Sequence, residues 1–483
     1  MKQVNIGPAH SHSFPERAAE LLSDSQLRRN VRHATDVISV KRRKVVAELP
    51  EWQSLRKSGS EIRQHVLNHL DEYLVQFERN CRDAGGQVHW AKDAEEARQI
   101  IHQLVLANGS REILKVKSMT TEEIGLNRFL QAEGFQVYET DLAELILQLG
   151  AEEPSHLVVP ALHKNREQVR QIFADKMNLP GIGDSPEDLT SAARAFLREK
   201  FLRVPVAISG ANFLIAENGA VCIVESEGNG RMCLTLPRLL ITLAGIEKVI
   251  PSFRDLEVFL QTLPRSATGE RMNPYNSIWT GVHSGDGPSA FHVVLLDNGR
   301  SRILRDRVAR QTLRCIRCGA CQNACPVYRE TGGHAYSSVY AGPIGAILTP
   351  QLRGFQQAST LPYASSLCGA CYEVCPVSID IPEVLLHLRS GIVREQQKTL
   401  SGQLGVWNVG MKLASFAMRS PWRFLLALRV ARVLQRWFLG RSGYIERLPF
   451  FLSGWTATRD LVPLAHQSFR EWWAEHETGR QRP

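Results

Sequence analysis

The chain has 483 residues, of which 43% are hydrophobic, and its formal net charge is +9. A chain of this length and composition can bury two or three hydrophobic cores and contains no low-complexity tract, which excludes a disordered or fibrous protein. The excess of Lys and Arg is not accompanied by a recognisable nucleic-acid-binding module, so a nucleic-acid partner is not expected.

The start of the chain argues for a cytoplasmic protein. Residues 1–30 are polar and charged and lack the apolar segment of a signal peptide. No uninterrupted apolar run reaches the roughly 18 residues that a transmembrane helix needs. Cysteines that are clustered at metal-ligand spacing fit a reducing compartment. We therefore expect a cytoplasmic protein without a transmembrane helix.

Residues 1–80 form a predicted helical N-terminal region, followed by an α/β domain over residues 81–300. In the first, apolar residues recur at steps of three and four, as in Ile62, Val66, Leu70 and Leu74. In the second, short β-rich runs alternate with helical runs, which is typical of a sheet with helical crossovers. The runs are Gln87–Trp90, Ala94–Ala107, Ile113–Val116, Leu126–Glu133, Gln136–Tyr138, Asp141–Leu149 and His156–Val159.

Two apolar strands flank Glu217-Asn218-Gly219, which predicts a hairpin. The second strand leads into a loop, Glu225–Arg231, that is rich in Gly and polar residues. Loops at the carboxyl ends of strands are where α/β folds bind ligands. Arg231 could therefore pair with a substrate carboxylate, with Glu225 or Glu227 as a base. The alternative is a plain acidic, Gly-rich turn.

Residues 264–300 are rich in Gly, Pro and Ser and are predicted to be a connector that contains one strand, His292–Leu296. A basic run follows, which comprises Arg300, Arg302, Arg305, Arg307, Arg310, Arg314 and Arg317. One interpretation is a solvated helix face. The other is that positive charge lies beside a metal cluster and raises its reduction potential.

Seven of the ten cysteines fall in two runs between Cys315 and Cys375. Three cysteines at steps of three, then one at a step of four followed by Pro, is the bacterial pattern for iron–sulfur ligation, in which the fourth Cys serves the other cluster. We therefore expect two clusters, and this pattern predicts 4Fe–4S centres. The first would take Cys315, Cys318, Cys321 and Cys375, and the second Cys325, Cys368 and Cys371. Zinc sites use paired knuckles and fit this spacing poorly.

The second set is one thiolate short, because Ser365 stands where a full run would carry Cys. Three explanations stay open: a ligand other than Cys, a missing iron as in a 3Fe–4S cluster, or a ligand from a partner. We predict that Ser365 is not itself a ligand and that the iron opposite it is absent, water-bound or partner-bound.

Residues 301–400 are predicted to be an all-helical ferredoxin-type domain. The two Cys runs are too far apart for a compact β-type ferredoxin, and the apolar spacing after Ile381-Pro382 predicts a helix beside the second run. Residues 401–483 are basic and aromatic, and Trp422–Phe438 is predicted to be an amphipathic helix with Arg429, Arg432 and Arg436 on one face. That helix could pack on its own protein, dock a partner or lie on an anionic membrane surface.

These features together resemble the lactate utilization protein B family over nearly the full chain. The segments that carry the resemblance are Thr121–Asn127, Ser209–Phe213, Glu225–Arg231, Gly245–Lys248, Leu296–Arg300, both cysteine runs and Ala364–Cys371. The family motif also has Ser at the position of Ser365. The resemblance implies that the α/β part is an LUD domain, similar in fold to sugar-isomerase and CoA-transferase-like proteins. It also implies the same division of the seven cysteines between two clusters.

The resemblance further implies a role in oxidising L-lactate to pyruvate within a complex of sister proteins. We therefore expect an electron-transfer component of an oxidoreductase complex, whose electron acceptor the sequence does not identify. No G-x-G-x-x-G fingerprint follows a strand, so no flavin or NAD site of that type is predicted. The alternatives are a subunit that oxidises a hydroxy acid at its own site in the α/β domain, and a redox-sensing iron–sulfur protein.

Overall fold

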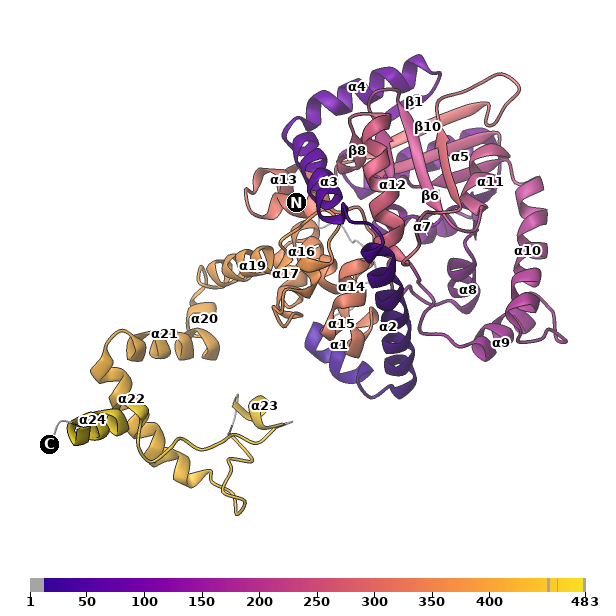
Figure 1. Ribbon diagram of the computed structural model, residues 1–483. Coiled ribbons are helices and arrows are strands. Elements are labelled where there is room, and N and C mark those ends of the chain that lie inside the picture. Colours follow the sequence, from indigo (N-terminus) through magenta and orange to yellow (C-terminus); the bar gives the residue numbers. More distant parts are fainter. Residues whose placement is uncertain (1–12, 450–451, 458, 481–483) are drawn as a thin grey trace. The chain divides into compact units, whose positions relative to one another are not determined.

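The computed structural model describes residues 13–449, 452–457 and 459–480 (Figure 1). The chain divides into two compact units, Met1–Ile392 and Val393–Pro483. The predicted helical N-terminal region forms α1 (Phe14–Leu21), α2 (Ser25–Ala47), α3 (Trp52–Asn68) and α4 (Leu70–Asp83), while residues 1–12 lie outside the described part. Asp24 begins α2 by accepting a hydrogen bond from the Leu27 N–H, which satisfies one of the N–H groups left free at a helix start.

A parallel six-stranded sheet forms the centre of the first unit, as the sequence predicted. Its strands are β1 (Gln87–Ala91), β2 (Glu112–Lys115), β3 (Gln136–Glu139), β4 (Val206–Ser209), β7 (Leu239–Gly245) and β10 (Ala290–Leu296). Their order is β1-β10-β7-β4-β2-β3. Since all these pairs are parallel, the carboxyl ends of the strands share one edge, which is where such sheets place ligands.

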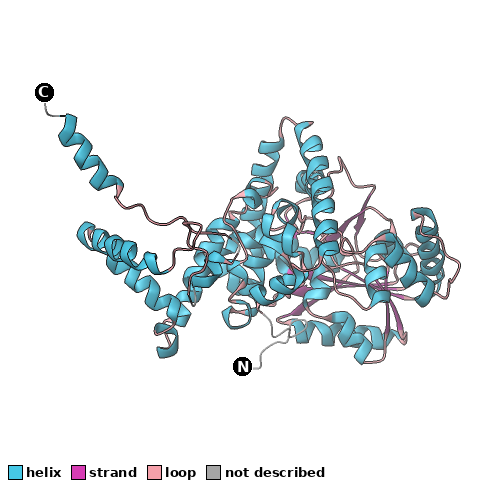
Figure 2. Cartoon of the chain, turned by 90° about the horizontal axis from the view of Figure 1, so that it is seen from below, coloured by secondary structure: helices cyan, strands magenta, loops and turns pink. Residues whose placement is uncertain are grey.

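The two faces of this sheet are covered by separate apolar cores. Helices α5 (Ala94–Asn108) and α7 (Leu126–Ala132) pack on one face with Val294 and Leu296 of β10. Helix α10 (Pro186–Arg203) and a second sheet pack on the other face, against Val293 and Leu295. This alternation along one strand is what burial on both faces requires. Figure 2 shows the strands enclosed by helices.

The second sheet contains the predicted hairpin. Strands β5 (Phe213–Ile215) and β6 (Ala220–Glu225) pair antiparallel around Glu217–Gly219, and β8 (Val249–Ile250) and β9 (Tyr275–Trp279) complete the order β8-β5-β6-β9. Gly219, at φ +67°, is required here because a Cβ would lie 2.2 Å from the main-chain nitrogen of Cys81.

Two sequence-based expectations were wrong. Residues 264–300 contain the predicted strand His292–Leu296, as part of β10, but they are not a connector, because they also contain β9 and because β10 lies between β1 and β7 inside the main sheet. His156–Val159 forms a loop and not a strand. Its Leu157 N–H donates to the side chain of Gln322, and His156 contacts Asn323. Long-range contacts outweigh local β preference in both places.

The cysteine-rich part of the first unit is helical, as predicted, and no strand occurs between residues 300 and 396. Its elements are α13 (Arg300–Arg305), η2 (Ala309–Arg314), α14 (Ala320–Ala324), α15 (Pro326–Thr331), η3 (His334–Tyr336), α16 (Gly342–Arg353), α17 (Phe355–Ala358), η4 (Leu361–Tyr363), α18 (Ala370–Glu373) and α19 (Ile381–Gln396). The predicted helix after the second cysteine run is α19.

The second unit is also helical. Its elements are α20 (Leu400–Gln403), α21 (Val406–Met418), α22 (Pro421–Leu434), η5 (Gln435–Trp437), α23 (Ser453–Thr456) and α24 (Phe469–Arg480). Of its described residues only Ile445 is buried. No helix in the described ranges is both long and apolar enough to cross a bilayer.

Candidate functional site

The two cysteine runs fold in the same way. Each carries Cys-Gly-Ala-Cys, and the glycines, Gly319 at φ +73° and Gly369 at φ +84°, begin the short helices α14 and α18 in the left-handed conformation. At Gly319 a Cβ would lie 3.1 Å from Val158 and 3.3 Å from His156. Glycine therefore lets each chain turn sharply between two cysteines and, at Gly319, approach a neighbouring loop.

Four of the seven cysteines surround one cavity. Cys315, Cys318, Cys321 and Cys375 line it together with apolar side chains that include Leu157, Ile344 and Ile379. The pKa of Cys318 is raised mainly by burial and, to a smaller extent, by the neighbouring Cys375 and Cys315. Cys375, which follows the other three cysteines by 54 or more positions in the sequence, thus lies at the same enclosed, apolar cavity.

The other three cysteines form an adjoining group. The pKa of Cys371 is raised to about 12, mainly by burial and, to a smaller extent, by the neighbouring Cys325 and Cys368. Cys368 is exposed, whereas Cys325 and Cys371 are buried. Cys371 also acts on Cys321 and contributes to the raised pKa of that thiol. The two groups are therefore neighbours, and the second reaches the protein surface.

Main-chain N–H groups point at the sulfur atoms. The Arg317 N–H donates to Cys315 Sγ at 3.4 Å, Ile379 to Cys375 Sγ at 3.4 Å and Tyr328 to Cys325 Sγ at 3.5 Å. All seven thiols are free of disulfides. Clustered thiolates with N–H donors are the ligand set of iron–sulfur clusters, so the residues present fit that cofactor.

The remaining cysteines lie elsewhere. Cys81, Cys222 and Cys233 are buried in apolar cores of the α/β part, and burial raises the pKa of both Cys81 and Cys222 to about 12. Such thiols are inert. Within the described ranges, no three His, Cys, Asp or Glu side chains converge on the position of a single metal ion.

The predicted basic run divides between the two interpretations. Arg302, Arg305 and Arg307 are exposed, so this part is a solvated face. The side chain of Arg317 is only 7% exposed and lies beside Cys315, and its guanidinium lies 3.1 Å from Glu247. Arg300 is also buried and forms a two-bond pair with Glu123 at 2.8 and 2.9 Å.

Glu247 joins these two arginines in one buried network. It accepts hydrogen bonds from Arg300 and Arg317. Burial alone would raise the pKa of Glu247, but Arg300, Arg317 and Lys248 outweigh it and lower this pKa to about 2. A network of buried ion pairs therefore connects the α/β part, through Glu123 and Glu247, to Arg317 beside the first cysteine group. We expect the positive charge of Arg317 to raise the potential of a cluster bound there.

Ser365 is half-buried, and its side chain is hydrogen-bonded within its own loop. Its hydroxyl accepts a hydrogen bond from the Leu367 N–H at 3.1 Å, and Leu367 has φ +56°. The hydroxyl thus closes a serine turn immediately before Cys368. This role is consistent with the prediction that Ser365 is not a ligand, which stays a prediction.

The three candidate catalytic residues after β6 are placed differently from one another. Both oxygens of Glu225 accept main-chain hydrogen bonds, from Gly230 at 2.7 Å and Arg231 at 2.6 Å. Glu225 therefore caps the start of α11 (Asn229–Thr235). Glu227 accepts from the Leu142 N–H at 2.9 Å, while the Arg231 side chain is exposed. Glu225 is therefore bonded to the main chain of Arg231 and not to its side chain.

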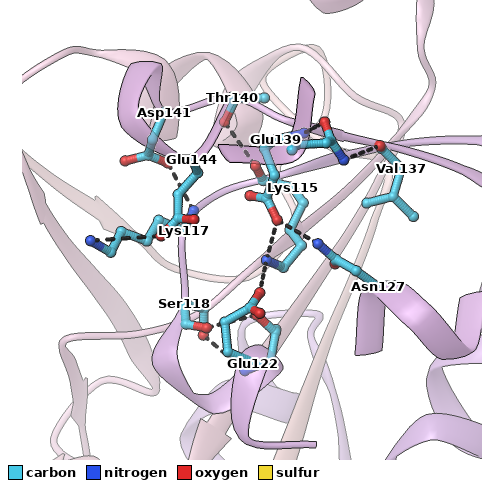
Figure 3. A network of polar contacts seen from close by, with 12 residues as sticks. Lys115, Lys117, Ser118, Glu122, Asn127, Val137, Glu139, Thr140, Asp141 and Glu144 are labelled. Atoms are coloured by element: carbon cyan, nitrogen blue, oxygen red, sulfur yellow. Dashed lines mark hydrogen bonds and ion pairs between the residues drawn. The ribbon is translucent and has the colours of Figure 1, made fainter. Parts of the chain in front are cut away.

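A buried polar network that the sequence reasoning missed lies at the carboxyl ends of β2 and β3 (Figure 3). Lys115 Nζ lies 2.6 Å from Glu139 and 2.7 Å from Glu122, and Asn127 donates to Glu139 at 2.5 Å. Burial would lower the pKa of Lys115, but Glu122 and Glu139 outweigh it and raise it. Burial raises the pKa of Glu139 despite Lys115. The available signal was the charged Lys115 within the predicted run Ile113–Val116, which is otherwise apolar.

Glu144, on α8 (Leu142–Gly150), lies beside this network and 3.8 Å from Lys117. Burial raises the pKa of Glu144 to about 8. The folded state thus favours the protonated carboxyl, so its stabilising contribution is complete below the ordinary carboxyl pKa and is lost as the pH rises through about 8. We expect the wild-type chain to lose on the order of 2–4 kcal/mol more than Glu144→Gln between about pH 5 and about pH 9.

Urea unfolding at the two pH values measures this difference, with the exposed Glu133→Gln as the matched control. Equal pH dependence in the wild type and Glu144→Gln would show that Glu144 is ionised in the folded protein at both pH values.

Comparison with known proteins agrees with these observations. A model of the LUD domain matches residues 74–296, and a model of the 4Fe–4S dicluster domain matches residues 311–379. Lactate utilization protein B 1 of Bacillus mycoides (strain KBAB4) is 43% identical over 464 residues, which cover 96% of each chain. Lactate utilization protein B of Bacillus subtilis (strain 168) is 43% identical over 478 residues, which cover 97% of each.

A third relative, named uncharacterized electron transport protein YkgF, of Escherichia coli (strain K12), is 41% identical over 468 residues, which cover 96% of this chain and 97% of the relative. Identity at this level over nearly the whole of each chain confirms the resemblance noted in the sequence. The chain therefore belongs to the lactate utilization protein B family and consists of an LUD domain, an iron–sulfur domain of the 4Fe–4S dicluster type and a basic helical C-terminal unit.

Proposed function

We propose that this chain is the iron–sulfur electron-transfer subunit of a cytoplasmic, multi-protein system that oxidises L-lactate to pyruvate. The observation that carries the proposal is the arrangement of seven cysteines in two adjoining groups, one enclosed and one that reaches the surface. Relatives named for lactate utilization and electron transport support the pathway.

In this proposal Cys315, Cys318, Cys321 and Cys375 hold one cluster, and Cys325, Cys368 and Cys371 hold a second. When bound, such clusters each exchange one electron. Oxidation of a hydroxy acid to a keto acid releases two electrons, so two adjoining centres suit it. Cys321 and Cys371 lie near enough to interact electrostatically, which supports a short path between the centres. The exposed Cys368 provides the point at which a partner protein delivers or takes electrons.

Co-purification tests the subunit role most directly. A tagged chain expressed with its native gene neighbours should bring down sister proteins, and the assembly should reduce an artificial acceptor with L-lactate while the chain alone should not. Full activity of the chain alone would overturn the subunit role, and an iron-containing chain without any lactate-linked activity in the assembly would favour the redox-sensor alternative.

The fourth position of the second cluster gives a specific expectation. Ser365→Cys should supply the missing thiolate and convert the second cluster to an ordinary four-cysteine 4Fe–4S centre. The change is measured by electron paramagnetic resonance of anaerobically prepared protein, with Ser366→Cys, one residue further along, as the matched control. An unchanged spectrum in Ser365→Cys would count against a vacant or externally supplied ligand position.

A second candidate function, binding of a hydroxy acid in the α/β domain, is favoured by a cavity of about 430 Å³. Its lining includes Glu122, Asn127, Glu139 and Arg353. Among the described residues, Glu139 Oε2 and Asn127 Oδ1 have no hydrogen-bond partner although both atoms are buried. A ligand hydroxyl could donate to these atoms while Arg353 pairs with its carboxylate.

Oxidation of lactate by the isolated chain would support this candidate. Arg353→Ala and Arg231→Ala then distinguish a substrate site in this cavity from one at the Glu225–Arg231 loop. Only the variant in the true binding site should raise the KM for lactate while its iron content stays intact. If neither variant changes KM, the substrate site lies on a partner.

A further inference from the structure

The second unit contains a long stretch with only one sign of charge. Residues 396–445 include no Asp or Glu, and they carry eight basic residues, namely Lys398, Lys412, Arg419, Arg423, Arg429, Arg432, Arg436 and Arg441. Most of the chain's net charge of +9 arises in this unit. A surface of this kind attracts anionic partners or anionic lipid.

Helix α22 and the turn η5 that follows it carry an apolar stripe that faces solvent. Trp422, Leu426, Val430, Val433 and Trp437 recur at steps of four, four, three and four, which places them on one side of a helix. Their exposed fractions are 63%, 51%, 49%, 59% and 78%. No residue of α22 is buried, so the contacts of this helix inside the second unit leave the stripe uncovered.

Helix α21 repeats the pattern. Val406, Val409, Leu413 and Phe416 recur at steps of three, four and three, and between 39% and 64% of each is exposed. Two successive helices therefore present apolar stripes to solvent. Stripes of this length are normally covered in the working protein.

Basic side chains lie along the edge of the α22 stripe. Arg429 and Arg436 are exposed and stand four residues before and three after Val433, so they share its side of the helix. Glu471 of α24 pairs with Arg432 at 3.2 Å and with Arg429 at 3.7 Å, and supplies the local negative charge. Arg423 stacks on Phe416 and Trp422, with its guanidinium carbon 4.2 Å and 5.6 Å from the ring centres.

This arrangement matches a bilayer surface better than a protein partner. Helices that lie in the membrane interface combine an apolar stripe with Arg at its edges, where the long side chains reach the headgroups, and Trp at the boundary. Protein interfaces, by contrast, lose charged residues at their apolar centre. The absence of acids over residues 396–445 complements anionic headgroups.

We propose that α21 and α22 bind the surface of an anionic phospholipid bilayer, with their apolar stripes in the interface and Arg429 and Arg436 among the headgroups. The binding is peripheral and reversible, since the stripes enter only the outer part of the bilayer. This surface does not depend on the electron-transfer role proposed above.

Co-sedimentation of the full-length, iron-loaded protein with vesicles tests the proposal. We expect binding to vesicles of phosphatidylglycerol mixed with phosphatidylcholine, little binding to phosphatidylcholine alone, and a severalfold loss when the salt is raised from about 0.1 M to about 0.5 M. Arg429→Gln with Arg436→Gln should weaken binding on the order of tenfold to thirtyfold. Trp422→Ser with Trp437→Ser should weaken it at both salt concentrations.

The matched control is Arg194→Gln with Arg198→Gln, two exposed residues of α10 that give the same change in charge. Iron content reports whether each variant is folded. Equal binding by the two arginine variants would overturn the proposal, as would wild-type protein that stays in solution with the anionic vesicles. Light scattering without vesicles then shows whether the Trp residues instead mediate contact with a second copy of the chain. If the protein neither binds vesicles nor self-associates, a partner protein covers the stripes.

Discussion

Cys318→Ala should remove the first cluster and lower the iron content by about half, from about eight to about four iron atoms for each chain. Cys318 lines the enclosed cavity and lies beside Cys315 and Cys375, away from the second group. Its loss leaves three thiols around an apolar cavity. Iron analysis and electron paramagnetic resonance measure the effect, since the signal of the second cluster should persist.

Cys222→Ala is the control for this experiment. Cys222 is fully buried in the hairpin strand β6 and lies in the apolar core, so its loss should cost some stability but no iron. A Cys318→Ala protein with the iron content of the wild type would contradict the assignment of this residue. Loss of iron in the Cys222→Ala protein would show that unfolding, and not ligand loss, controls the iron content.

Arg300→Leu should be the most destabilising single substitution among the charged residues considered, at about 3–5 kcal/mol. Arg300 is 1% exposed and bridges Glu123 and Glu247. Its removal leaves two buried carboxylates with less compensating charge, and Tyr340, which donates to Glu123 at 2.5 Å, replaces only part of it. The midpoint of urea unfolding under anaerobic conditions measures the loss.

Arg305→Leu, at the exposed end of α13, is the matched control and should change stability by about 0.5 kcal/mol or less. The network also contacts the first cysteine group through Arg317. We therefore expect Arg300→Leu to loosen iron binding as well as the fold. A loss below about 1 kcal/mol would show that the buried charges are not paired as described.

The cysteine groups were predictable because cluster ligation imposes a local spacing that the sequence displays directly. The same holds for the hairpin at Glu217–Gly219 and the helix after Cys375, whose signals are short-range. The parallel sheet was predictable as a class from the alternation of β-rich and helical runs. Each of these features is signalled by residues close together in the chain, even where the contacts that the feature forms are long-range.

What escaped prediction depends on residues far apart. Lys115 pairs with Glu139 of the neighbouring parallel strand. Arg300 pairs with Glu123, which lies 177 positions earlier in the sequence. Glu225 looked like a base beside a Gly-rich loop, but the fold turns the next residues into a helix whose N–H groups occupy it. Strand β10 was predicted as a strand, but its place inside the main sheet was not, because only its distant neighbours β1 and β7 define it.

Metal analysis of anaerobically purified protein, together with electron paramagnetic resonance, tests the central claim most directly. We predict a brown protein with about seven or eight iron atoms for each chain, the lower value if the second cluster is of the 3Fe–4S type, and with signals from two clusters across the oxidised and reduced samples. A colourless protein that contains zinc in place of iron would contradict the account.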